Sequence, residues 1–140
     1  MRKEVGTIYI KQYKNGNSGV WGINPKNKEQ NYALDLLMDP DIPVVTLVGK
    51  AGCGKTLLAV AAGLEQVLQT SIYTRMIVSR PIQPMGRDLG YLPGTLEEKM
   101  TPWLAPVKDN LEFLMADDKD NLKMQVDSGK IQIEALTYIR

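Results

Sequence analysis

A glycine-rich segment, Gly49–Thr56, constrains the fold of this chain more than any other feature. Its residues, Gly49-Lys50-Ala51-Gly52-Cys53-Gly54-Lys55-Thr56, satisfy the pattern G-x-x-x-x-G-K-[ST] at every fixed position. The preceding residues 44–48 are a short, β-branched, apolar run that predicts a buried parallel strand. The following residues 57–68 have the length and composition of a helix. A strand, a glycine-rich turn and a helix in this order predict a phosphate-binding loop in an α/β fold.

The chemistry of this loop follows from its spacing. Glycines let successive backbone N–H groups converge on an anion at the positive end of a helix. Lys55 is expected to reach the β- and γ-phosphates, and the Thr56 hydroxyl to hold Mg²⁺. The expected cofactors are ATP and Mg²⁺, with Lys55 and Thr56 as catalytic candidates and Thr56 as the metal ligand. The candidate cofactor-binding residues of the loop are Gly49, Lys50, Ala51, Gly52, Cys53, Gly54, Lys55, Thr56 and Leu57.

Length and composition limit the classes of protein to which the chain can belong. A chain of 140 residues with 44% hydrophobic and 24% charged residues fits one globular domain, and a net charge of +1 gives no nucleic-acid signature. No apolar run approaches about 20 residues, and residues 1–5 do not open a signal peptide. With one cysteine, Cys53, and no histidine, an intrachain disulfide, a cysteine metal cluster and a histidine base are excluded. We therefore expect a cytoplasmic protein without a membrane partner.

The residues before the loop predict a hairpin and a helix. Residues 7–13 alternate as a strand, and residues 20–23 are expected to return beside them. A helix is expected from Asn27, its N-cap, to Met38. The apolar face expected of it consists of Tyr32, Ala33, Leu36 and Leu37.

Gln30 lies in the first turn of that helix. Its amide can donate to one atom of an adenine edge and accept from another, which suits it to reading this base. A glutamine that faces solvent explains the same residue, and spacing alone leaves both interpretations open.

After the helix at 57–68, residues 75–79 predict a second parallel strand and so a βαβ unit. The segment 80–94, rich in Pro and Gly, leaves the end of this strand where open α/β sheets bind ligands. Arg80 and Arg87 could contact phosphates there, although surface arginines explain them equally well.

The last third of the chain predicts short helices and a strand. Thr95 and Glu98 form a capping box, and a second helical piece is expected to begin at Thr101-Pro102 and to end or kink at Pro106. Further short helices are expected near residues 109–115 and 121–126, followed by a strand at 131–134.

The hydrolytic acid of a P-loop ATPase has no clear candidate in this sequence. Such an enzyme needs a carboxylate at a strand end to organise Mg²⁺ and the attacking water. Glu134 ends an alternating run and is expected to be a half-exposed strand residue instead. Because the sequence stops where another strand would be expected, we expect the nucleotide-binding half without the Walker B acid.

Four segments together resemble the PhoH-like ATPase family. They are GVWGINPKNKEQNYALDLL, VTLVGKAGCGKTLLAVAAGLEQVL, SRPIQPMGRDLGYLPGTLEEKMTPWLAPVKDNLEFL and SGKIQIEALTYIR, and they lie within residues 19–140. More narrowly, they are similar to the amino-terminal part of the ATPase domain in proteins where PhoH follows a PIN ribonuclease domain. The resemblance implies a P-loop NTPase fold like RecA and superfamily 1 helicases, a parallel sheet with flanking helices, truncated here before Walker B. It makes residues 1–23 a hairpin or linker and residues 24–140 a partial ATPase domain.

The resemblance also implies a function for the longer protein. It implies Mg²⁺-dependent ATP hydrolysis coupled to RNA or another nucleic acid, and allows a homo-oligomer. It favours Gln30 as an adenine contact and Arg80 as a functional residue whose role is unassigned. Cys53 stands where the family usually has Thr, so the thiol adds a site for oxidation or alkylation unless it is buried.

Two other functions remain open. One is a P-loop kinase for a small metabolite, with residues 81–94 as its substrate lid. The other is a nucleotide-sensing assembly module with no catalytic role. The first predicts phosphate transfer to an acceptor, and the second predicts a change of oligomeric state without turnover.

Overall fold

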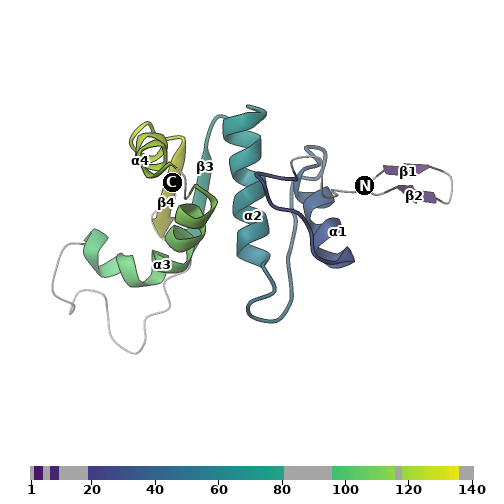
Figure 1. Cartoon of the computed structure of the whole chain (residues 1–140), viewed down its shortest axis with the longest axis horizontal. Coiled ribbons are helices and arrows are strands. Elements are labelled where there is room, and N and C mark those ends of the chain that lie inside the picture. Colours follow the sequence, from purple (N-terminus) through teal and green to yellow (C-terminus); the bar gives the residue numbers. More distant parts are fainter. Residues whose placement is uncertain (1, 5–6, 10–18, 81–95, 116–117, 136–140) are drawn as a thin grey trace. The chain divides into compact units, whose positions relative to one another are not determined.

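A computed structural model describes residues 2–4, 7–9, 19–80, 96–115 and 118–135 of the chain (Figure 1). It consists of two compact units, residues 1–73 and residues 74–140, which are described here one at a time. The predicted domain boundary after residue 23 stays a prediction. No described helix is both long enough and apolar enough to cross a membrane.

The first unit begins with a small antiparallel sheet. Strands β1 (Arg2–Glu4) and β2 (Thr7–Tyr9) pair with Arg2 opposite Tyr9. The predicted pairing of residues 7–13 with residues 20–23 is therefore wrong for the described part of this hairpin. Residues 10–13 lie outside the described residues.

Residues Gly19–Ile23 form a tight turn of their own, which we call the Trp21 turn. The N–H of Val20 donates to the Ile23 carbonyl (3.0 Å), and the N–H of Ile23 donates to the Val20 carbonyl (2.9 Å). Trp21 and Gly22 have φ of 48° and 72°, the positive values of a type I′ turn. The Trp21 N–H also donates to Glu65 Oε2 at 2.9 Å, which ties the turn to a segment far along the chain.

Helices α1 (Lys28–Leu37) and α2 (Lys55–Leu64) pack together in this unit (Figure 1). A buried cluster holds them to the Trp21 turn and consists of Val20, Leu34, Leu58 and Ala62. The predicted N-cap Asn27 is confirmed, because its Oδ1 accepts from the Gln30 N–H at 2.8 Å. The predicted apolar face of α1 is wrong in part. Leu34 is the fully buried residue, whereas Tyr32 is 45% exposed.

A π-helical turn, η1 (Glu65–Gln69), continues α2, so the helical segment ends close to residue 68, the predicted end. The buried Gln66 side chain lies where this turn meets the end of α1. Its Nε2 donates to the carbonyls of Leu37 and Ala62, both at 3.1 Å. The first bond satisfies a carbonyl at the carboxyl end of α1 and the second reaches a carbonyl of α2, so this one amide connects the two helices.

The strand predicted at residues 44–48 is absent from the described structure. Residues 42–50 have no regular secondary structure, and Val44 and Val48 are 78% and 92% exposed. A strand needs a neighbour for its backbone N–H and C=O groups, and the two sheets of the described residues take their strands from elsewhere. The expected βαβ unit is therefore not formed. Asp39 shapes the turn before this segment, where the N–H of Asp41 donates to its Oδ1 (3.0 Å) and lowers the pKa of Asp39.

The second unit contains a two-stranded parallel sheet, which confirms the predicted strands at 75–79 and 131–134. Strand β3 (Met76–Arg80) pairs with β4 (Ile131–Ala135), with Met76 opposite Ile131 and Arg80 opposite Ala135. Helix α4 (Lys119–Asp127) precedes β4, packs against it and is capped by Asp118, whose Oδ1 accepts from the Asn121 N–H.

Helix α3 (Leu96–Leu114) is continuous through Pro102, where a second helical piece was expected to begin, and through Pro106, where that piece was expected to end or kink. Each proline removes one intrahelical hydrogen bond, at a cost of about 3 kcal/mol in a helix interior. Val107 and Leu111 of α3, and Met115 directly after it, recur every fourth residue and are all buried, so this side of the helix is packed. The predicted end at Pro106 is wrong, because α3 continues to Leu114, whereas the alternative of a kink there stays a prediction. Thr95 of the predicted capping box lies outside the described residues.

Candidate functional site: the phosphate loop and its cavity

The glycine-rich segment leads directly into the amino terminus of α2. Gly54 is the N-cap, with φ of 89° and ψ of 10°, and Lys55 is the first helical residue. The left-handed backbone at Gly54 is readily adopted only by glycine, which explains this fixed position of the motif. The first N–H groups of a helix have no partner inside it and carry its positive dipole end. The loop therefore lies at the start of α2, but the residues directly before it do not form a strand.

The backbone donors of this loop are open. Across the described residues, no N–H group from Lys50 to Leu57 donates a hydrogen bond to the protein. The segment 49–53 is exposed, so these donors face solvent. Gly52, like Gly54, has a positive φ, which is how successive N–H groups form a concave anion-binding nest. The loop has the donors and the shape to hold a polyanion.

Lys55 supplies the positive charge inside the loop. Its Nζ donates to the carbonyls of Gly49 (2.9 Å) and Lys50 (2.7 Å) and lies 3.6 Å from Cys53 Sγ. These contacts hold the ammonium against the loop through carbonyl oxygens and leave the loop amides unoccupied. The loop is narrow here, since a Cβ at Gly49 would lie 3.1 Å from Cys53 Sγ. Cys53 is exposed, so burial does not shield its thiol.

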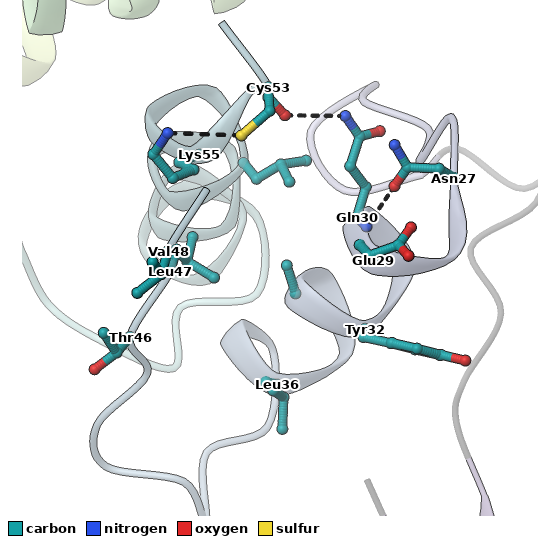
Figure 2. A pocket seen from close by; sticks show the side chains of 12 residues that line it. Asn27, Glu29, Gln30, Tyr32, Leu36, Thr46, Leu47, Val48, Cys53 and Lys55 are labelled. Atoms are coloured by element: carbon teal, nitrogen blue, oxygen red, sulfur yellow. Dashed lines mark hydrogen bonds between the residues drawn. The ribbon is translucent and has the colours of Figure 1, made fainter. Parts of the chain in front are cut away.

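Helix α1 brings Gln30 beside the loop. The cap at Asn27 fixes the first turn of the helix, and Gln30 Nε2 donates to the Cys53 carbonyl at 3.2 Å (Figure 2). Gln30 Oε1 accepts from the Lys26 N–H at 2.7 Å. The residue predicted from the sequence to read a base therefore touches the predicted phosphate loop.

A cavity of about 290 Å³ opens between α1, the segment 46–48 and the loop, at the lower end of the size of ligand pockets (Figure 2). Its walls are mostly apolar, with polar groups from the loop and the first turn of α1. The lining residues are Asn27, Glu29, Gln30, Tyr32, Ala33, Leu36, Thr46, Leu47, Val48, Cys53, Lys55 and Leu58. An apolar cavity beside open N–H donors suits a ligand that has a flat, apolar group at one end and a negatively charged group at the other.

The structure brings most of the predicted site residues together, but not all of them. Gln30 and Gly49–Leu57 lie in the first unit, whereas Arg80 is an exposed residue at the end of β3 in the second. Arg87 lies outside the described residues. Within the described ranges no three His, Cys, Asp or Glu side chains gather as metal ligands. The prediction of Thr56 as a metal ligand stays a prediction.

Sequence reasoning missed two parts of this site. The first is the backbone N–H of Lys26. Any residue except proline would supply it, so the residue type at this position does not indicate its role. The second is the apolar wall, to which Tyr32 and Leu36 of α1 contribute. Those two residues were expected to form the packing face of the helix, and their spacing alone does not distinguish a cavity wall from a core.

Known proteins resemble this chain closely. A family model described as PhoH-like protein matches residues 22–140. Protein PhoH2 of Bacillus subtilis (strain 168) is 51% identical over 142 residues, which cover 98% of this chain and 31% of that protein. Protein PhoH2 of Thermobispora bispora is 42% identical over 126 residues (89% of this chain, 28% of that protein), and Protein PhoH of Escherichia coli (strain K12) is 31% identical over 118 residues (84% and 32%). The chain spans about a third of the length of these relatives. No solved structure matches it significantly.

Proposed function

This chain belongs to the PhoH-like protein family, a family of P-loop NTPases, and on that premise we propose that it binds Mg·ATP through the loop Gly49–Thr56. The observation that carries the proposal is the set of open N–H groups from Lys50 to Leu57 at the start of α2. An anion at a helix start gains both hydrogen bonds and the favourable dipole. A triphosphate is the anion whose remaining part, a base and a sugar, suits the adjoining cavity.

Lys55 changes partners in this proposal. Its ammonium now rests on the neutral carbonyls of Gly49 and Lys50. Phosphate oxygens form charge-assisted hydrogen bonds, which are roughly twice as strong as neutral ones. We therefore expect the ammonium to turn toward the β- and γ-phosphates when the nucleotide arrives. Thr56, exposed in the first turn of α2, would hold Mg²⁺ through its hydroxyl.

Gln30 also belongs to the proposed site. It would contact the base from the first turn of α1, where it already lines the cavity. Arg80, at the carboxyl end of a parallel strand in the second unit, is proposed separately as a phosphate-binding residue for a nucleotide or a nucleic acid.

The whole protein, of which this chain spans one part, would hydrolyse ATP and couple hydrolysis to the remodelling of RNA. An ATPase assay on the longer protein with and without RNA tests this part of the proposal. Stimulation by RNA is expected. Transfer of phosphate to a small acceptor, or a change of oligomeric state without turnover, would contradict it.

The binding proposal is tested on the chain itself with a series of adenine nucleotides. Calorimetric titration with ATP, ADP and AMP, each with and without Mg²⁺, should show affinity that falls with every phosphate removed. Adenosine should bind most weakly, because it offers nothing to the open amides. Equal affinity for ATP and adenosine would contradict a phosphate-binding role for the loop.

A further inference from the structure

A second cavity, of about 270 Å³, lies where the Trp21 turn meets η1. Its described walls come from Trp21, Gly22, Glu65 and Gln69, and none of these residues lines the cavity beside the phosphate loop. The phosphate loop precedes the first residue of α2, whereas η1 follows the last one, and the ten residues of α2 span about 15 Å. The second cavity is therefore a separate site from the proposed nucleotide site.

Both walls of this second cavity have an uncommon backbone. Trp21 has φ of 48°, and a positive φ is rare for a bulky side chain. The other wall, η1, is a π-helical turn, a form that occurs frequently at functional sites. Backbone conformations of this kind cost free energy and gather where proteins bind ligands. They direct attention to what the cavity can hold.

The Glu65 carboxylate gives the cavity a fixed negative charge. Its Oε2 accepts the Trp21 N–H at 2.9 Å in a part-buried contact, which holds the carboxylate in place. In the part of the chain that the structure describes, no lysine or arginine pairs with Glu65 and no group donates to its Oε1. A partly buried charge is stabilised by an opposite charge, so this oxygen suits a cation.

The rest of the wall also favours a positive charge. The turn η1 is the carboxyl end of the helical segment that begins with α2, where the helix dipole is negative, and neither element has a basic residue in its last turn. Gln69 lies four residues after Glu65, and its side-chain amide has no partner among the described residues. Trp21 adds an indole ring, the aromatic group that attracts cations most strongly.

A guanidinium group suits these features better than an ammonium group. It is flat, stacks on aromatic rings and donates to a carboxylate within its own plane, whereas an ammonium is compact and more strongly hydrated. The described lining contains no basic residue, so nothing there would bind the carboxylate of a free amino acid. An arginine inside a peptide chain has no such carboxylate and therefore fits better than free arginine.

We propose that this cavity binds the arginine side chain of a partner protein. The guanidinium lies against the indole of Trp21 and donates to Oε1 of Glu65, and the amide oxygen of Gln69 accepts a further N–H. The Trp21 N–H keeps its bond to Oε2 and so positions the carboxylate for the guanidinium.

The test compares a peptide-like arginine with its uncharged counterpart. The ¹⁵N-labelled chain is titrated with N-acetyl-arginine amide and, separately, with N-acetyl-citrulline amide, in which a urea of similar shape replaces the guanidinium. The arginine probe should shift the backbone amide signals of Trp21, Gly22, Glu65 and Gln69 until they saturate, and the citrulline probe should not. Equal shifts with both probes, or no saturable shift with either, would overturn the proposal.

Glu65→Gln separates the charge of Glu65 from its role in the fold. The variant keeps an oxygen for the Trp21 N–H but removes the negative charge, so it should weaken binding of the arginine probe at least about threefold. Glu112→Gln, at an exposed position of α3, is the matched control and should leave the affinity unchanged. Weakening in both variants, or in neither, would overturn the proposal.

Gln69→Glu covers the case in which Glu65→Gln does not fold. It adds a second carboxylate to the wall at an exposed position and should strengthen binding of the arginine probe by a similar factor. An unchanged or weaker affinity would contradict a cation site.

Free arginine identifies the source of the guanidinium. It carries the same side chain as N-acetyl-arginine amide but also an unpaired carboxylate, so it should bind more weakly. Equal or tighter binding of free arginine would overturn the protein partner in favour of a small-molecule site.

Discussion

Two glycine-containing turns of the first unit use their backbone N–H groups in opposite ways. In the Trp21 turn, the N–H groups of Val20, Trp21 and Ile23 all donate within the protein. In the phosphate loop, no N–H group from Lys50 to Leu57 does so in the part of the chain that the structure describes. Both turns contain residues with positive φ, so backbone shape does not distinguish them. The Trp21 turn uses these donors to hold the fold, whereas we propose that the open donors of the phosphate loop take a ligand.

The sharpest test of this contrast is Lys55→Ala in the phosphate loop. It should weaken ATP binding by about 1.5–3 kcal/mol, because a charged hydrogen-bond donor to the phosphates is lost. The free energy of unfolding should change by less than about 0.5 kcal/mol, as for other surface substitutions. Titration calorimetry and urea denaturation measure the two effects. Lys123→Ala, exposed on α4, is the control, and an unchanged ATP affinity in Lys55→Ala would break the contrast.

Gly19→Ala in the Trp21 turn is expected to lower stability and to leave ATP affinity unchanged, which is the reverse of Lys55→Ala. A Cβ there would lie 2.5 Å from the Ile23 carbonyl oxygen, and φ at Gly19 is 55°. Both effects should lower the free energy of unfolding by about 1–3 kcal/mol. The affinity of the folded molecules for ATP should stay the same. A variant as stable as the unmodified chain in urea denaturation would show that this turn does not stabilise the unit.

Glu65→Ala tests the contact that holds the Trp21 turn to η1. It removes the acceptor of the Trp21 N–H, which is part-buried, and should cost about 1–2 kcal/mol of unfolding free energy. Glu65→Gln keeps an acceptor oxygen and should lose less. Thermal denaturation followed by circular dichroism compares the two, and equal losses would mean that the hydrogen bond is not what stabilises the turn.

The smallest expected effect belongs to the cap that connects α1 with the phosphate loop. Asn27→Ala should destabilise the chain by about 1 kcal/mol through the lost bond to the Gln30 N–H. It should also weaken ATP binding slightly, since Gln30 is placed by this first turn. Asn27→Asp preserves the cap and serves as the control. If Asn27→Ala weakened ATP binding more than Lys55→Ala, the proposal that Lys55 contributes more to ATP binding than the cap would be contradicted.

The sequence predicted those features that depend on local chemistry. Asn27 was predicted to cap α1 and does so, because the first N–H groups of a helix need an acceptor that an Asn side chain supplies. The two strands of the parallel sheet were also predicted, from residues 75–79 and from the alternating run at residues 131–134.

The features that depend on a partner could not be predicted in the same way. Residues 44–48 have the composition of a strand, but composition does not provide the neighbour that a strand requires. Helix α3 continues past Pro106, and the burial of Val107 and Leu111 beyond that proline depends on packing that local rules do not reveal. The Lys26 N–H, which donates to the Gln30 side chain, belongs to the backbone, so the residue type at position 26 does not indicate it.

The central claim is that the open amides of the phosphate loop receive the phosphates of a nucleotide. Nuclear magnetic resonance of the ¹⁵N-labelled chain, titrated with Mg·ATP, observes these amides one by one. We predict that the largest shifts occur from Lys50 to Leu57 and that Val20–Ile23 stay unchanged. Saturating Mg·ATP that leaves the loop amides unshifted, or that shifts the Trp21 turn instead, would contradict the account.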